Sequence, residues 1–382
     1  MESNTNCSAS LPECYESSGA LAVIIIPSML ALSTVVVMLV IFCSLYKTKH
    51  REQRTSAPFI SASVSGARIY PALLSWELPE EQSLDGLELW HTGHYGPVCK
   101  GLLRNRDGSS SLVVVKSLRD NPDQSETAEF VEWLLFHAKV CKHENVVQML
   151  YCQTRGSPLY LVLEACNPGN LLHFLWTLRN SSSPADPLQR FSERSVFLVA
   201  KQVAAGLDYL MSEHRLVHGD VAARNILIGP DFSARVAGLG VAFEGRRTDL
   251  TTRQRAAEVP LKWQAPERVV MQLCIDRSDV WSFGILLYEL ITLGSPPYPD
   301  LEPPSVLPKL LASYRMKRPK HCGSSLYDLM KYCWMWSFKD RPAFSAIIKL
   351  LTSSLHLAAT EHICIPDIVN VSEYNRDAGL LL

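Results

Sequence analysis

Residues 218–225 read His-Gly-Asp-Val-Ala-Ala-Arg-Asn, and the interpretation of the fold begins from this stretch. It places the carboxylate of Asp220 a few residues before the polar side chains of Arg224 and Asn225, with apolar residues between them. Loop carboxylates often cap backbone groups, so the stretch alone is compatible with a purely structural role. Its meaning therefore depends on the motifs that follow and precede it.

Further motifs follow this stretch in a part of the chain whose pattern is mainly helical. They are Val-Pro-Leu-Lys-Trp-Gln-Ala-Pro-Glu at 259–267, Asp-Val-Trp-Ser-Phe-Gly at 279–284, and Cys333-Trp334 with Arg341-Pro342.

The part before the stretch has strand and turn signals. A glycine-containing turn at 92–98 precedes a valine-rich strand at 112–116, which ends in Lys116. A helix is predicted over 125–141, and two more strands are predicted over 146–150 and 159–164. A small sheet-rich part followed by a larger helical part predicts an α+β arrangement with a cleft between the two.

Taken together, these motifs resemble the eukaryotic protein kinases, and the tyrosine protein kinase family in particular, over residues 76–355. Residues 218–225 match the catalytic loop H-R-D-x-x-x-x-N, with the Ala-Ala-Arg that is typical of tyrosine kinases. The resemblance implies a bilobal protein-kinase-like fold with a small β-rich N-lobe and a helical C-lobe. It also implies a buried structural ion pair between Glu267 and Arg341.

The resemblance assigns roles to the residues of the site. Asp220 takes the position of the catalytic base, and Lys116 takes that of the lysine that contacts the ATP phosphates. Asn225 takes a metal-ligand position, for Mg or Mn. The positions assigned to ATP are Gly93, Gly96, Val98, Val114, Lys116, Glu164, Cys166 and Asn225.

Several residues depart from the family's pattern. Gly238-Leu239-Gly240 stands where the family has D-F-G, so Leu239 fills the apolar position and Gly238 offers no oxygen to a metal. His91 replaces the first glycine of the Gly-rich loop, and Val114 replaces a small alanine against the adenine ring. We therefore expect weakened binding of nucleotide and metal.

Two further departures concern the helix and the loop that control activity in the family. Trp133 falls where the helix normally supplies a glutamate to the strand lysine, and Glu129 or Glu132 could substitute only if the helix rotates. Gly219 replaces the arginine that receives a phosphorylated activation loop, and the corresponding loop, 241–258, contains no tyrosine. Tyrosine phosphorylation of this loop is therefore not expected to switch the protein.

These departures leave two functions open. The first is a catalytically impaired kinase or pseudokinase, which acts as a scaffold for cytoplasmic kinases or other signalling proteins. The alternative is a weak but genuine ATP-dependent protein tyrosine or dual-specificity kinase, with Asp220 as base and Lys116 on the ATP. Metal-dependent nucleotide binding would separate them.

Residues 20–46 form an apolar run without Lys, Arg, Asp or Glu, which predicts one transmembrane helix. A buried core helix would be interrupted by polar residues at helical spacing. A secretory signal peptide would begin with basic residues, whereas the charged side chains that precede this run are all acidic. Basic residues follow it, at Lys47, Lys49, Arg51 and Arg54. Residues 1–19 are therefore expected outside and the kinase-like domain in the cytoplasm, at the plasma membrane.

The segments that flank the helix and the domain are short. Residues 1–19 contain a glycosylation sequon at Asn6, and residues 47–75 resemble a juxtamembrane linker. Residues 356–382 are predicted to form a C-terminal tail, in which Tyr374 is either a docking site for an SH2 adaptor or an ordinary tail tyrosine. Self-association of the apolar helix leaves a homodimer open.

The charge balance limits the choice of partners. Lys and Arg number 37 and Asp and Glu 38, which gives a formal net charge of -1. A nucleic-acid-binding protein that depends on bulk electrostatics would be strongly basic, so nucleic acid is not an expected partner.

Overall fold

The computed structural model describes residues 63–64, 67–68, 70–180, 190–246, 259–366 and 368–380. The predicted outer segment with Asn6, the predicted transmembrane helix at 20–46 and most of the linker lie outside these residues. Within the described ranges, no helix combines the length and the apolar character that crossing a membrane requires.

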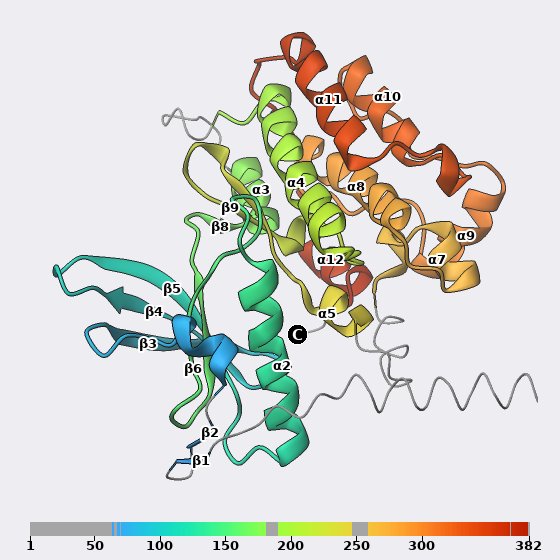
Figure 1. The fold of residues 1–382 in the computed structure, drawn as a ribbon. Helices are drawn as coiled ribbons and strands as arrows, with labels where there is room; N and C mark the ends of the chain where they lie inside the picture. Colours follow the sequence, from blue (N-terminus) through green and yellow to red (C-terminus); the bar gives the residue numbers. More distant parts are fainter. Residues whose placement is uncertain are drawn as a thin grey trace, which may run out of the picture. The chain divides into compact units, whose positions relative to one another are not determined.

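The first part of the domain is built on a five-stranded antiparallel sheet (Figure 1). Its spatial order is β3-β4-β5-β7-β6, formed by β3 (Ser83–Thr92), β4 (Pro97–Arg104), β5 (Ser110–Ser117), β6 (Met149–Gln153) and β7 (Tyr160–Glu164). One face buries aliphatic side chains that alternate along the strands, as a half-buried sheet requires: Leu103, Val113, Val115 and Val162. The other face meets the cleft.

Helix α2 (Gln124–Val140) packs beside this sheet, next to the helical part of the domain (Figure 1). A capping box starts it, because Asp123 Oδ1 accepts from the Glu126 amide at 2.7 Å and Glu126 Oε2 accepts from the Asp123 amide at 3.1 Å. The 3₁₀ helix η1 (Pro71–Trp76) precedes the sheet, and its Leu73 is fully buried in the same core as α2. Two short strands, β1 (Ser63–Val64) and β2 (Ala67–Arg68), come before η1.

The second part is mainly helical. Its centre is α8 (Asp276–Ile291), whose side chains are buried almost throughout, with α4 (Glu193–His214) packed beside it. The other helices of this part are α3 (Leu171–Asn180), α5 (Gly240–Arg246), α7 (Pro266–Met271), α9 (Pro303–Leu311), α10 (Ser324–Cys333), α11 (Phe344–Ser354) and α12 (Val371–Asp377). The 3₁₀ turns are η3 (Ala223–Asn225), η4 (Pro230–Phe232), η5 (Leu261–Trp263), η6 (Phe338–Asp340) and η7 (Leu355–Leu357).

A small three-stranded sheet lies at the junction of the two parts and carries the segments that matter for function. Its order is β10-β9-β8, formed by β8 (Gly169–Asn170), β9 (Ile226–Ile228) and β10 (Ala234–Val236). Residues 218–225 lead into β9, and Gly238 lies two residues after the end of β10. The pairing of β9 with β10 therefore brings the two segments side by side. The bilobal α+β prediction is confirmed.

The predicted ion pair in the helical part is also confirmed. Arg341 Nη1 lies 2.7 Å from Glu267 Oε1, and Nη2 lies 2.8 Å from Oε2, with both residues buried. The guanidinium donates further bonds to the carbonyls of Met335 and Arg277. This fork geometry fixes α7 against the loop that carries Arg341.

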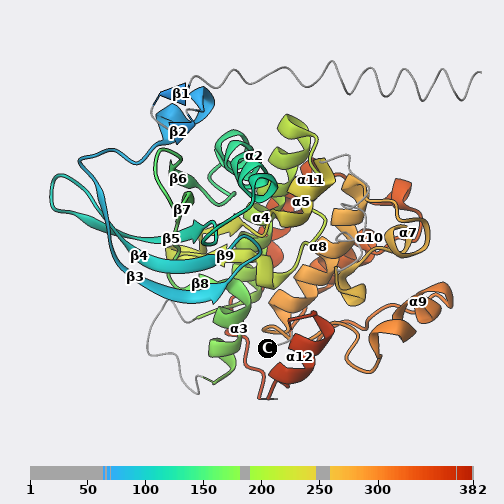
Figure 2. The same cartoon turned by 90° about the horizontal axis from the view of Figure 1, so that it is seen from below.

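The expectation that Tyr374 belongs to a C-terminal tail is wrong for this part of residues 356–382. Tyr374 lies on α12 and is fully buried, with its hydroxyl donating to Glu289 of α8. Its ring packs edge-on against Trp176 of α3, at 5.3 Å between centroids, and against Trp263, at 5.4 Å (Figure 2 shows α12 beside α3). A buried ion pair, Lys262 Nζ to Asp377 Oδ2 at 2.6 Å, holds the end of the helix. A tyrosine in this position cannot present its hydroxyl to an SH2 adaptor.

Candidate functional site

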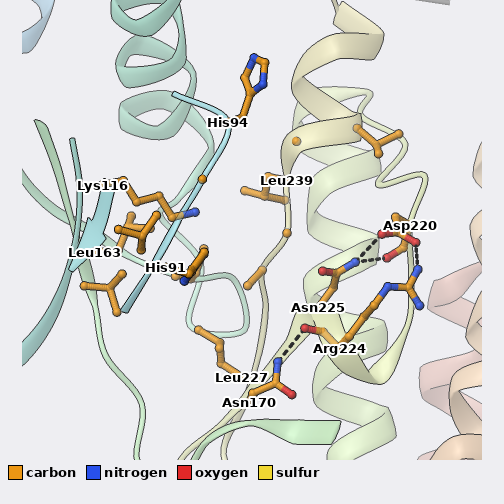
Figure 3. Close-up of a pocket in the computed structure, with 18 of the residues that line it drawn as sticks. His91, His94, Lys116, Leu163, Asn170, Asp220, Arg224, Asn225, Leu227 and Leu239 are labelled. Carbon is orange, nitrogen blue, oxygen red and sulfur yellow. Dashed lines mark hydrogen bonds and ion pairs between the residues drawn. The ribbon is translucent and has the colours of Figure 1, made fainter. Parts of the chain in front are cut away.

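A cavity of about 790 Å³ lies between the sheet and the helical part. Its walls come from the β3–β4 turn, β5, the end of β7, residues 220–227 and residues 237–241 (Figure 3). The predicted residues that line it are Gly93, Gly96, Val98, Val114, Lys116, Glu164, Asp220 and Asn225. Cys166, which was also assigned to ATP, does not line it.

One end of the cavity is apolar. Val98 and Val114 come from neighbouring strands of the large sheet, Leu163 comes from β7 and Leu227 from β9, and all four side chains line the cavity (Figure 3). Branched aliphatic side chains with no polar atoms suit the faces of a flat heteroaromatic ring. Val114 is only half-buried, so the valine narrows this end without closing it.

Lys116 projects into the cavity from the end of β5. It forms no hydrogen bond or ion pair with any residue that the structure describes, and burial lowers the pKa of its ammonium group. The glutamates predicted as substitutes are elsewhere. Glu129 accepts a hydrogen bond from the Tyr95 hydroxyl at 3.0 Å and lies 3.7 Å from His94 Nε2, whereas Glu132 is exposed.

Trp133 occupies the helix position at which the family's glutamate was expected. Its ring stacks on Phe136, with centroids 5.7 Å apart, and meets Phe243 of α5 edge-on at 4.9 Å. An aromatic cluster thus joins α2 to α5 at the position where the family has a glutamate that pairs with the strand lysine. Such packing depends on buried area and not on charge.

Residues 218–225 are held in place by hydrogen bonds to Asp279 of α8 and to the carbonyl of Ala237. The carboxylate of Asp279 accepts from the backbone amides of His218, at 2.6 Å, and Gly219, at 2.8 Å, and His218 Nε2 lies 2.7 Å from the Ala237 carbonyl. Burial raises the pKa of Asp279, although these donors oppose that effect. Asp279 belongs to the quoted motif at 279–284, but its supporting role was not predicted.

Both oxygens of the Asp220 carboxylate are engaged within this loop. Oδ1 accepts from Arg224, and Oδ2 accepts from Asn225 Nδ2 at 2.7 Å (Figure 3). Asn170 Nδ2 donates to the Arg224 carbonyl at 2.7 Å and holds this residue from the other side. Asp220 and Asn225 are therefore brought together as predicted, but they bond to each other.

Gly238 faces Asn225 in a conformation that suits only glycine. Its φ is +72°, and a Cβ atom built on it would lie 2.5 Å from Asn225 Cγ and Oδ1. Leu239 beside it is buried, as predicted for the apolar position. Any side chain at 238 requires the Asn225 amide to move away from Asp220.

These residues fit a nucleotide better than they fit a divalent metal. The apolar end suits a base, and Lys116 suits a phosphate. A hard cation needs several oxygen ligands, whereas Gly238 has none and Asp220 is already bonded to Arg224 and Asn225. Within the part of the chain that the structure describes, no three His, Cys, Asp or Glu side chains gather in a way that could hold a metal ion.

Comparison with known proteins gives one consistent result. The sequence profile of the protein tyrosine and serine/threonine kinases matches residues 87–351. Tyrosine-protein kinase STYK1 of Mus musculus is 33% identical, over 98% of this chain and 94% of the mouse protein. STYK1 of Homo sapiens is 40% identical, over 81% of this chain and 74% of the human protein. Fibroblast growth factor receptor homolog 1 of Drosophila melanogaster is 31% identical, over 75% of this chain and 40% of that receptor.

Proposed function

Because this chain belongs to the protein tyrosine and serine/threonine kinase family, we propose that it is a single-pass membrane signalling protein with a catalytically impaired, pseudokinase-like domain. In this role the domain binds cytoplasmic kinases or other signalling proteins, and phosphoryl transfer by the domain itself is slow or absent. Fold alone does not decide between kinase and pseudokinase, so the proposal rests on the site.

The observation that carries the proposal is the geometry at Gly238. Phosphoryl transfer depends on a cation that bridges the phosphates and neutralises the charge that develops on them. In this chain Gly238 lacks the carboxylate, and the nearby Asn225 amide is turned toward Asp220, to which Nδ2 donates at 2.7 Å. No glutamate among the described residues pairs with Lys116, and Trp133 fills the helix position from which the family supplies one. The missing carboxylate at Gly238 and the unpaired position of Lys116 both weaken the same step, the positioning of the ATP phosphates for transfer.

The membrane part of the proposal rests on the sequence. The uncharged run at 20–46 is long enough to cross a bilayer, with residues 1–19 and the Asn6 glycan outside. The basic residues that follow the run keep the kinase-like domain on the cytoplasmic side of the plasma membrane. Association of two apolar helices would give a homodimer.

A single-turnover measurement tests the catalytic part. Full-length protein in detergent is incubated with labelled ATP and either Mg²⁺ or Mn²⁺, beside Lys116→Met and Asp220→Asn. We expect no phosphoryl incorporation above that of the two variants, with all three proteins folded. Incorporation that both substitutions abolish would instead establish the alternative, a weak genuine kinase in which Asp220 acts as the base.

A further inference from the structure

His91 and Lys116 lie in one row across three strands of the sheet. His91 of β3 pairs with Val98 of β4, and Val98 pairs with Lys116 of β5. Residues that pair directly across strands point to the same face, so both side chains face the cavity that they line (Figure 3). Neighbouring strands are about 4.8 Å apart, so two such spacings separate the backbones of His91 and Lys116, while the side chains of both line the same cavity.

The acidic groups that line the cavity are Glu164, Asp220 and Glu244, and none of them forms a hydrogen bond or ion pair with His91 or Lys116. Glu164 Oε1 forms an ion pair with Arg235 Nε and accepts a hydrogen bond from the Gln148 amide, each at 2.8 Å. Asp220 is bonded to Arg224 and Asn225. Neither His91 nor Lys116 has a hydrogen bond or ion pair with a described residue. The sheet side of the cavity therefore presents two basic side chains, His91 and Lys116, that are available to an anionic ligand.

The opposite wall lacks the aspartate carboxylate with which the family binds a divalent cation, because Gly238 stands in its place. Gly238 has no side-chain oxygen, so the carboxylate through which a metal would compensate the charge of a polyphosphate is missing there. From this disagreement we infer that the cavity binds a nucleoside polyphosphate without a divalent metal, with His91 and Lys116 contacting the phosphates directly. This inference rests on the proposed loss of the metal site, and it adds His91 as the residue that compensates for it.

The inference predicts how binding depends on pH. The groups that face His91 are Lys100 of β4, Lys116 of β5 and His94 of the turn, and across the cavity Asp220 and Arg224. Burial, and then the two lysines, lower the pKa of His91 below its ordinary value when the cavity is free of anions. A bound phosphate favours the protonated ring, so nucleotide affinity rises as the pH falls.

ATP itself, with EDTA or with Mg²⁺, is the probe for this inference. Binding to the full-length protein is measured by calorimetry at about pH 6 and about pH 8. His91→Gln removes the charge but keeps a polar side chain of similar size. Arg104→Gln is the matched control, because it removes a cation from the same face of the sheet but outside the cavity and away from His91. Thermal unfolding without nucleotide checks that each variant is folded.

We expect ATP to bind in EDTA, more tightly at the lower pH, with no gain from Mg²⁺. His91→Gln should weaken binding about tenfold and remove the pH dependence, whereas Arg104→Gln should change binding little. The inference is overturned if binding requires Mg²⁺, if His91→Gln binds like the wild type, or if folded protein binds no ATP. The last two outcomes leave the impaired-kinase proposal standing, because only phosphoryl transfer in the single-turnover assay refutes that.

Discussion

At the scale of single residues, Gly238 is required by the backbone as well as being unable to bind a metal. A φ of +72° disfavours every side chain, and Asn225 occupies the place of a Cβ atom. We expect Gly238→Ala to lower the free energy of unfolding by about 1–2 kcal/mol. Denaturant unfolding of the full-length protein measures this.

Gly240 provides the control for this prediction, two residues away. It has no positive φ, and no atom lies within 4 Å of its added Cβ, so Gly240→Ala should leave stability unchanged or raise it slightly. Asn225→Ala combined with Gly238→Ala should recover the part of the loss that comes from the contact. If Gly238→Ala and Gly240→Ala lower the free energy of unfolding equally, the loss does not come from the backbone conformation and the contact with Asn225 at Gly238.

The ion pair of Glu267 and Arg341 is the strongest single interaction that the sequence predicted. Burial acts to raise the pKa of Glu267, but the hydrogen bonds and charge of Arg341 outweigh it and leave the pKa below its ordinary value of 4.5. A lowered folded-state pKa adds stability above the unfolded-state pKa, and this stability is lost as the pH falls through the folded-state value.

We expect Glu267→Gln to lower the free energy of unfolding by about 3–5 kcal/mol near neutral pH, because Arg341 is left buried without its carboxylate. The difference between wild type and variant should shrink as the pH falls below 4.5. Unfolding measured along this pH series tests both parts. The exposed pair of Arg104 and Asp85 serves for comparison, since Asp85→Asn should cost less than about 1 kcal/mol.

At the scale of elements, the sequence predicted those that are defined locally and missed those that depend on distant contacts. The helix over 125–141 is observed as α2, because a capping box and an apolar stripe are both readable in the chain. The strand expected over 146–150 begins only at Met149. Val146 is buried and apolar, but its bridge is to Val236, so an apolar run alone did not identify its partner.

The candidate site shows the same division. Its lining residues followed from motif spacing, because a strand–turn–strand unit fixes how Val98, Val114 and Lys116 face one cavity. The bonds of Glu129 to Tyr95 and of Asp220 to Arg224 could not be predicted, since each depends on side-chain rotamers that neighbouring elements select. The position of Trp133 was predicted, but its packing on Phe243 was not.

Helix α12 is the element for which prediction failed most clearly, and its burial has a measurable consequence. The Tyr374 hydroxyl is enclosed beside Glu289, so an added tyrosine kinase should phosphorylate it much more slowly than Tyr332, whose exposed fraction is 53%. Mass spectrometry of the folded protein over time compares the two sites. Equal rates would mean that α12 does not stay docked.

Asp377→Asn provides the second arm of this experiment. It removes the carboxylate that lies 2.6 Å from Lys262 Nζ and leaves a buried ammonium group without its counter-charge. The end of α12 should then detach more often, so phosphorylation of Tyr374 should speed up while that of Tyr332 stays the same. An unchanged Tyr374 rate would show that the ion pair does not hold the helix.

At the scale of the whole molecule, the distribution of charge about residues 20–46 makes the topology testable. The charged side chains that precede the run are all acidic, and four basic ones follow it closely, at Lys47, Lys49, Arg51 and Arg54. Basic residues near a transmembrane helix are retained in the cytoplasm, so the N-terminus is translocated and the kinase-like domain is not. We expect an epitope tag before Met1 to be stained on intact cells, and a C-terminal tag only after permeabilisation.

Two variants separate this prediction from its alternatives. Asn6→Gln should remove a mobility shift that is sensitive to glycosidase, because a glycan is added only on the translocated side. Replacing Lys47, Lys49, Arg51 and Arg54 by glutamine should reduce the fraction of molecules whose N-terminal tag is stained, since the charge difference across the helix is then lost. If the C-terminal tag is stained on intact cells, or if the protein is extracted from membranes by carbonate, the proposed single-pass topology is wrong. The kinase-like domain would then act in another compartment, although its cavity and its missing metal ligand would be unchanged.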